Sequence, residues 1–131
     1  MSDASPVYEL GPPRPLREKE AALIRKLVSG TPFEGKVLRQ LSKTLVQDML
    51  DGSMGSVHFC KMSSEERRLG KEIAEGSFRD ADGVLVSVTL NLDQFGDLFE
   101  LDIWKVDFSP LIGYPDPDDF EVTNRHGRLG W

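Results

Sequence analysis

The stretch that decides the fold covers residues 84–108 and reads VLVSVTLNLDQFGDLFELDIWKVDF. Every second residue from 84 to 92 is apolar, and from 87 onward the residues between them are polar. This period-two pattern is typical of a strand with one buried face. Turn residues over 93–96 then lead into a second strand over 98–108. The polar face of this hairpin carries Asn91, Asp93, Glu100 and Asp102. We therefore expect a half-exposed antiparallel sheet with an acidic face, which is a surface for meeting a partner and not a catalytic signature.

The second strand of this hairpin changes phase in its middle. Apolar residues fall on one face as far as Ile103 and on the other face from Trp104 onward. A one-residue slip at this point, which is a β-bulge, would bury both sets, and the pattern favours it. In the alternative, Trp104 is exposed beside Glu100 and Asp102.

The rest of the chain predicts an α+β fold. Apolar residues at helical spacing predict helices over 16–28 and 33–41. Alternation and turn residues predict further strands over 44–50, 56–62 and 71–79. The expected architecture is two N-terminal helices packed on an antiparallel meander sheet of about five strands. The expected domain organisation is an extended leader at 1–13, a single α+β domain at 14–111, and an acidic, Pro- and Gly-rich tail at 112–131.

Composition excludes several classes of protein. The chain has 131 residues and a formal net charge of −6, which disfavours binding to nucleic acid through phosphate neutralisation. Its single cysteine, Cys60, rules out an intramolecular disulfide. No apolar stretch approaches the roughly 20 residues that span a bilayer, and the first residues do not form a secretory signal. We therefore predict a cytoplasmic protein with neither a nucleic-acid nor a membrane partner.

Residues able to do chemistry are few and scattered. His58 and Cys60 are two apart on a predicted strand, and His126 would complete a set of three metal ligands. Zinc sites usually have four ligands, or three with a water, in paired motifs that this sequence lacks. No nucleophile or paired acid is arranged around His58 by the sequence. We therefore predict no catalytic residue, no metal and no cofactor, so that the protein is not an enzyme.

Several runs of the chain resemble a known family. These are the run that ends in DIWKVDFSPL at 102–111, and the opening RPL at 14–16 with EAALI at 20–24. They resemble a family of small, uncharacterised bacterial α+β domains over about residues 14–111. Small acidic α+β proteins of this kind are often immunity partners of bacterial toxins. The resemblance therefore implies an immunity protein that neutralises a basic toxin domain, although a fold does not by itself establish a function.

The predicted binding site follows from the acidic hairpin face. We expect a basic protein partner to contact Asn91, Asp93, Glu100 and Asp102, with Trp104 as an aromatic anchor if it is exposed. Asp116, Asp118 and Asp119 of the tail form a second predicted patch. Two alternatives stay open. The same carboxylates would serve a small metal-dependent hydrolase, and the predicted strand 44–50 would serve a self-associating domain, such as a dimer, if it lies at a sheet edge.

Overall fold

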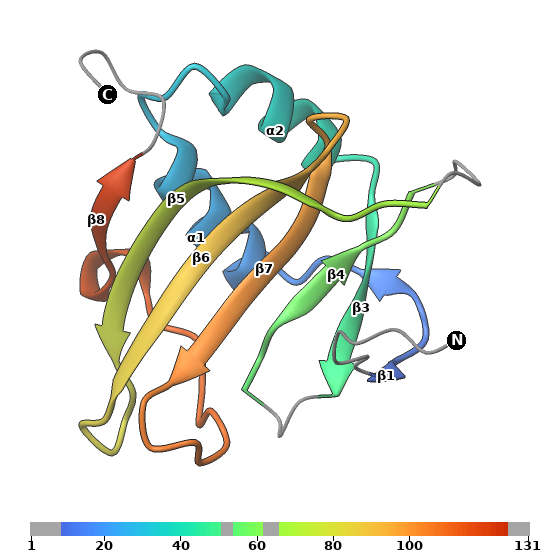
Figure 1. Ribbon diagram of the computed structural model, residues 1–131. Helices are drawn as coiled ribbons and strands as arrows, with labels where there is room; N and C mark the ends of the chain where they lie inside the picture. Colours follow the sequence, from blue (N-terminus) through green and yellow to red (C-terminus); the bar gives the residue numbers. More distant parts are fainter. Residues whose placement is uncertain (1–8, 51–53, 62–65, 126–131) are drawn as a thin grey trace.

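The computed structural model describes the backbone of residues 9–50, 54–61 and 66–125 (Figure 1). Within these residues the helices are α1 (Glu18–Val28), α2 (Glu34–Leu41) and the short 3-10 helix η1 (Pro117–Asp119). The strands are β1 (Glu9–Leu10), β2 (Arg14–Pro15), β3 (Leu45–Leu50), β4 (Val57–Phe59), β5 (Leu69–Arg79), β6 (Leu85–Asp93), β7 (Leu98–Lys105) and β8 (Glu121–Arg125). The result is an α+β fold that is mostly sheet.

The sheet differs from the predicted five-stranded meander, which is wrong. It has eight strands in the order β1-β3-β4-β7-β6-β5-β8, with β2 also paired to β3, and every pairing is antiparallel. Only β5, β6 and β7 form a meander, because β7 then pairs with β4 and β8 pairs with β5. The strands that the sequence missed, β1, β2 and β8, are two to five residues long and have no alternation of their own. They become strands because β3 and β5 offer them unpaired backbone groups.

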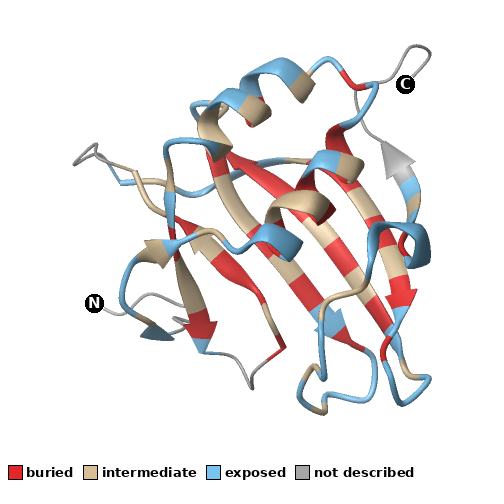
Figure 2. Cartoon of the chain, turned by 180° about the vertical axis from the view of Figure 1, so that it is seen from behind, coloured by how far each residue is buried: buried red, intermediate tan, exposed pale blue. Residues whose placement is uncertain are grey.

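The helices also depart from the predicted layer of two on one face. Helix α1 lies behind the sheet, against β5 and β8, and buries Leu23, Ile24, Leu27 and Val28 in the core (Figure 2). Helix α2 sits at one end of the sheet, and Val37 is its single buried residue (Figure 2). Its eight residues carry Lys, Arg, Gln and Gly between the apolar positions, so its apolar stripe is narrow.

The central hairpin follows the sequence pattern closely. Val88 pairs with Ile103 and Leu90 with Leu101, and all four side chains are buried in the core. The bulge predicted between Ile103 and Trp104 is wrong, because the register shift falls after Asn91 instead. Strand β7 ends at Lys105 in a turn, so the apolar residues beyond it need no place in the core.

Candidate functional site

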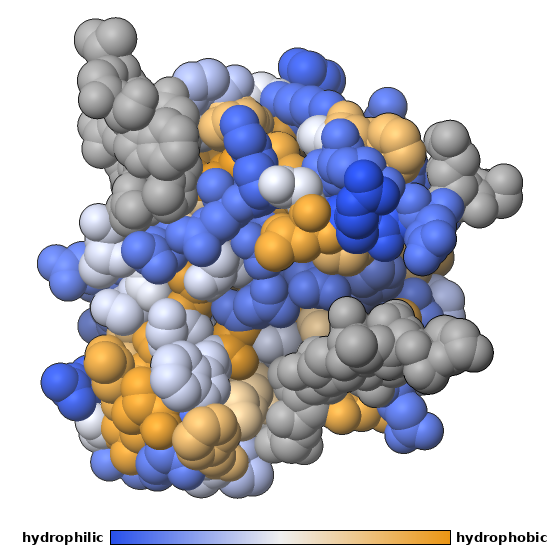
Figure 3. Space-filling model, viewed as in Figure 1, coloured by the Kyte–Doolittle hydropathy of each residue, from blue (hydrophilic) through white to orange (hydrophobic). Residues whose placement is uncertain are grey.

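One face of the sheet is left uncovered by the described helices, and we call it the open face. It points toward the viewer in Figure 1, on the side away from α1. Cross-strand pairs place the following side chains on it: Gln47 with His58, Glu72 with Asn91, Glu75 with Thr89, Asn91 with Glu100, Thr89 with Asp102, and Ser87 with Trp104. Figure 3, drawn from the same side, shows a broad band of hydrophilic side chains across this face. The open face is therefore polar and carries carboxylates on β5 and β7.

An asparagine links the strands at the centre of the open face. Asn91 is buried, and its Nδ2 donates a hydrogen bond of 2.6 Å to Asp102 Oδ2. Glu100 lies directly opposite Asn91, and its Oε2 is 3.9 Å from His58 Nδ1, a contact that carries charge only when His58 is protonated. The structure thus brings together three of the predicted site residues, Asn91, Glu100 and Asp102.

An aromatic pair, which we call the aromatic corner, stands at the end of β7. Trp104 is 48 % exposed, so the alternative in which it lies beside Glu100 and Asp102 is confirmed. The ring of Phe108 lies 5.8 Å from that of Trp104, centroid to centroid, and Phe108 is 68 % exposed. Phe108 has a φ of 64°, a left-handed conformation that costs a bulky residue about 1 kcal/mol or more.

A buried ion-pair cluster fixes the loop that carries Phe108. Lys105 is buried, and its Nζ donates to Asp80 Oδ2 at 2.8 Å, to Asp82 Oδ2 at 2.7 Å and to the Pro110 carbonyl at 3.2 Å. Asp80 also accepts the backbone N–H of Ile112 at 2.8 Å. Burial alone would raise the pKa of Asp80, but these hydrogen bonds outweigh it and hold the pKa below its ordinary value. The aromatic corner is therefore held by the interior of the protein.

Asp93 is buried, so it is not an exposed member of the predicted site. Its carboxylate is buried and accepts the N–H groups of Phe95 at 2.8 Å and Asp97 at 3.0 Å, together with Arg67 Nη1 at 3.1 Å. Burial would raise the pKa of Asp93, but these hydrogen bonds hold it below its ordinary value. Arg67, whose Nη2 also lies 3.3 Å from His58 Nε2, pairs with Asp93 and compensates its charge. The role of Asp93 is to close the β6–β7 turn.

The acidic patch of the tail lies apart from the open face. Asp116, Asp118 and Asp119 are exposed at η1, next to α1, which packs on the other side of the sheet. Asp116 Oδ1 is 3.5 Å from Lys19 Nζ, and Lys26 Nζ donates to the Phe120 carbonyl at 2.6 Å. The structure therefore does not join these three residues to Glu100 and Asp102.

The structure bears on the two alternative functions, a metal-dependent hydrolase and a self-associating domain. Among residues 9–50, 54–61 and 66–125, no three His, Cys, Asp or Glu side chains gather closely enough to hold a metal ion; His126 lies outside the described residues. The strand expected at an edge, β3, pairs on one side with β4 and on the other with β1 and β2, so its backbone is not open to a second copy.

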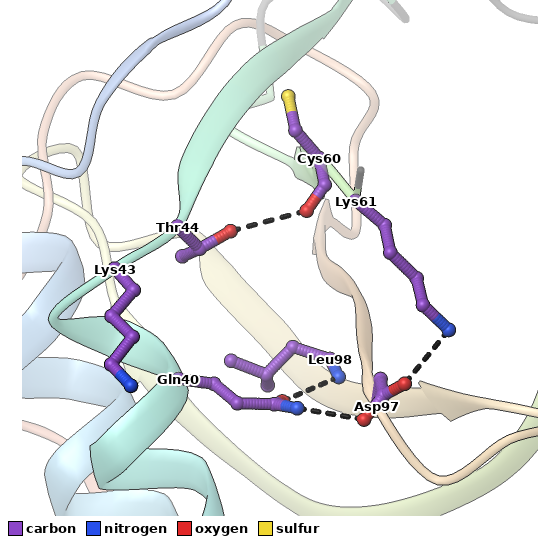
Figure 4. A pocket seen from close by; sticks show the side chains of 7 residues that line it. All are labelled: Gln40, Lys43, Thr44, Cys60, Lys61, Asp97 and Leu98. Carbon is purple, nitrogen blue, oxygen red and sulfur yellow. Dashed lines mark hydrogen bonds and ion pairs between the residues drawn. The ribbon is translucent and has the colours of Figure 1, made fainter. Parts of the chain in front are cut away.

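A small cavity lies beside Cys60, between α2 and the β6–β7 turn (Figure 4). Gln40 donates to Asp97 Oδ1 at 2.7 Å and accepts the Leu98 N–H at 2.9 Å, while Lys61 Nζ pairs with Asp97 at 2.8 Å. Burial raises the pKa of the Cys60 thiol, which disfavours the thiolate. These polar groups hold the β6–β7 turn in place, and they do not form a catalytic arrangement around Cys60.

Sequence reasoning missed Glu72, Glu75 and Phe108. The two glutamates join the open face because β5 pairs with β6, and the alternation around them is broken by a register shift. Phe108 was assigned to the strand, whereas β7 ends three residues earlier. The available signal was the Asp107-Phe108-Ser109-Pro110 run, because Asp and Pro favour a turn there.

A family model described as Domain of unknown function (DUF6984) matches residues 13–115. The match covers most of the chain, so the protein belongs to this family. No curated protein and no solved structure matches the chain. Neither α1 nor α2, nor any other helix in the described part of the chain, is long and apolar enough to cross a membrane.

Proposed function

We propose that this family member is a non-catalytic protein-binding module that uses its open face to bind a basic protein partner. The observation that carries the proposal is a sheet face that the described helices leave uncovered, on which Glu100 and Asp102 lie beside an exposed tryptophan, Trp104. Tryptophan is enriched among the residues that dominate binding energy at interfaces. A sheet face that offers charge and an aromatic anchor suits a macromolecular surface.

Electrostatics supports a partner of positive charge. Like charges repel one another, and Glu72 on β5 and Glu100 and Asp102 on β7 lie on either side of β6, which carries Asn91. A cationic surface lowers that repulsion when it binds. The net charge of −6 adds a long-range attraction that speeds the encounter with a basic protein.

In its most concrete form, the proposal is that the protein is a bacterial, cytoplasmic immunity protein that neutralises a cognate toxin. What supports this form is the resemblance of its sequence to small acidic α+β domains, together with its negative charge. An immunity protein needs no chemistry of its own, because it acts by covering a basic surface of the toxin. The open face is the surface that we assign to this task.

The experiment is affinity capture from a lysate of the source cells with two charge-reversed variants. We expect the E100K/D102K variant to lose a stoichiometric basic partner that the unmodified protein captures. The matched control is D118K/D119K, which changes the net charge by the same amount on the other side of the sheet and retains the partner. Equal capture by both variants, or equal loss, would reject the open face as the binding surface. Circular dichroism verifies that both variants are folded.

A further inference from the structure

We propose that a groove beside β7 binds one arginine side chain of the protein partner, with its guanidinium stacked on Trp104 and paired with Glu100 and Asp102. This inference rests on the proposed function and names the residue that the open face recognises. It is argued from the shape of the groove, from the way its aromatic wall is held, and from its charge.

The groove exists because β4 leaves β7 early. The two strands pair only at Val57 with Leu101 and at His58 with Glu100. Beyond that point Ser56 Oγ accepts the Ile103 N–H at 2.8 Å and donates to the Ile103 carbonyl at 3.1 Å, which satisfies the backbone of β7 without a strand. A groove of about 600 Å³ opens here. Met49 and Met54 form one wall, and Glu100, Asp102, Trp104 and Phe108 form the other.

Both walls are fixed before any partner arrives. On one side, the Tyr114 hydroxyl donates to the Gly55 carbonyl at 2.6 Å and so holds the segment next to Met54. On the other side, the N–H and Oγ of Ser109 donate to Asp107 Oδ1 at 3.0 and 2.6 Å and hold Phe108 in its left-handed conformation. A strained, exposed aromatic residue on a braced loop is the kind of feature that persists at binding sites, because a preorganised wall loses little entropy on binding.

The chemistry of the walls selects the occupant. Met49 and Met54 are largely buried residues that line the groove and give it an apolar side for a methylene stem. The exposed indole of Trp104 offers a face on which a planar guanidinium stacks, and the carboxylates of Glu100 and Asp102 accept its N–H groups. An apolar side chain in the same place would remove water from these carboxylates without replacing the hydrogen bonds that the water makes. An acidic side chain would be repelled. Lysine has neither a planar cation that stacks on an indole nor a fork of N–H donors that pairs with two carboxylates, so arginine fits best.

The test uses the tryptophan of the groove as its own reporter. The chain has two tryptophans, so Trp131→Phe leaves Trp104 as the single tryptophan in the full-length protein. The probes are hexa-arginine, hexalysine and hexacitrulline peptides at physiological salt. We expect hexa-arginine to change the Trp104 emission and to bind about tenfold more tightly than hexalysine. Hexacitrulline, which keeps the shape but loses the charge, has no measurable effect. Equal binding of the arginine and lysine peptides would overturn the proposal.

Variants locate the effect and separate it from the proposed function. Phe108→Gly and Glu100→Gln should remove the preference for arginine over lysine, whereas Phe95→Ala, an exposed phenylalanine at the opposite end of the sheet, should retain it. If E100K/D102K abolishes partner capture but Phe108→Gly leaves the peptide preference intact, the groove assignment fails and the proposed function stands. If partner capture also survives E100K/D102K, both fail.

Discussion

Two sets of carboxylates in this acidic chain occupy opposite environments. Asp80 and Asp93 are buried at strand ends, where backbone N–H groups and the cations Lys105 and Arg67 surround them. Glu100 and Asp102 lie on the open face, where Asn91 donates to Asp102 and His58 is 3.9 Å from Glu100. The first set neutralises its charge within the fold, and the second set lies half-buried on the open face. The number of acidic residues therefore does not tell which of them stabilise the fold and which are placed to bind a partner. The hydrogen-bond and ion-pair partners of each residue indicate its role.

The two sets are also mechanically connected. The Asp80 cluster fixes the loop after β7, and that loop carries Phe108 of the aromatic corner. Asp93 fixes the turn between β6 and β7, which sets the register that places Asn91 beside Glu100. The buried carboxylates stabilise the geometry in which Glu100 and Asp102 are placed on the open face.

The largest effect is expected at Asp80. Asp80→Ala leaves the buried Lys105 with half of its carboxylate partners and frees the loop that Asp80 holds, so we expect a loss of about 3–5 kcal/mol in the free energy of unfolding. Asp82 binds the same ammonium, but its side chain is 38 % exposed, and Asp82→Ala should cost about 1 kcal/mol or less. Urea denaturation of both variants measures the difference. Similar losses would mean that burial does not distinguish these carboxylates.

The next effect is expected where β5 approaches the turn held by Asp93. A Cβ at Gly70 would lie 2.2 Å from the Asp93 carbonyl oxygen, and this neighbour is backbone that cannot move aside. We expect Gly70→Ala to lower the free energy of unfolding by about 2–3 kcal/mol. Gly113→Ala is the control, because nothing lies within 4 Å of its Cβ, and its effect should stay within about 0.5 kcal/mol. An unchanged stability for Gly70→Ala would show that the turn tolerates displacement.

A smaller, pH-dependent effect is expected at Asp97. The hydrogen bond from Lys61 is the main reason that the pKa of Asp97 falls to about 2. A carboxyl whose pKa is lower in the folded state stabilises the fold above its unfolded pKa of about 4, and that contribution is lost as the pH falls toward 2. We expect about 1 kcal/mol after solvent screening. Thermal unfolding between pH 6 and 2.5 should show a shallower loss for Asp97→Asn and for Lys61→Met than for the unmodified protein. Parallel curves would contradict the assignment.

The smallest effect on stability is expected at Phe108. Phe108→Gly removes an exposed ring and relieves a left-handed conformation, so we expect the free energy of unfolding to stay constant or to rise by up to about 1 kcal/mol. Phe108→Ala removes the ring but keeps the strain, and it should be no more stable than the unmodified protein. Chemical denaturation compares the two. A loss of more than about 1 kcal/mol for Phe108→Gly would mean that the aromatic corner stabilises the fold and is not reserved for binding.

Much of the local structure follows from sequence alone. The helices expected over 16–28 and 33–41 are observed as α1 (Glu18–Val28) and α2 (Glu34–Leu41), because each segment carries apolar residues at helical spacing. The hairpin of β6 and β7 forms because strict alternation commits one face of each strand to the core. The same alternation correctly placed Asn91, Glu100 and Asp102 on a shared polar face.

The tertiary structure decided what no local pattern encodes. Strands β1, β2 and β8 are too short for periodicity, and they exist because neighbouring strands have unpaired backbone groups. The burial of Asp93 depends on the N–H groups of the β6–β7 turn and on Arg67, which is 26 residues away in the chain. Trp104 is exposed because β7 keeps its alternation as far as Lys105, whose ammonium is held in the interior by Asp80. Side-chain periodicity is a local property of one segment, whereas the partners of a buried charge are brought together only when the whole chain folds.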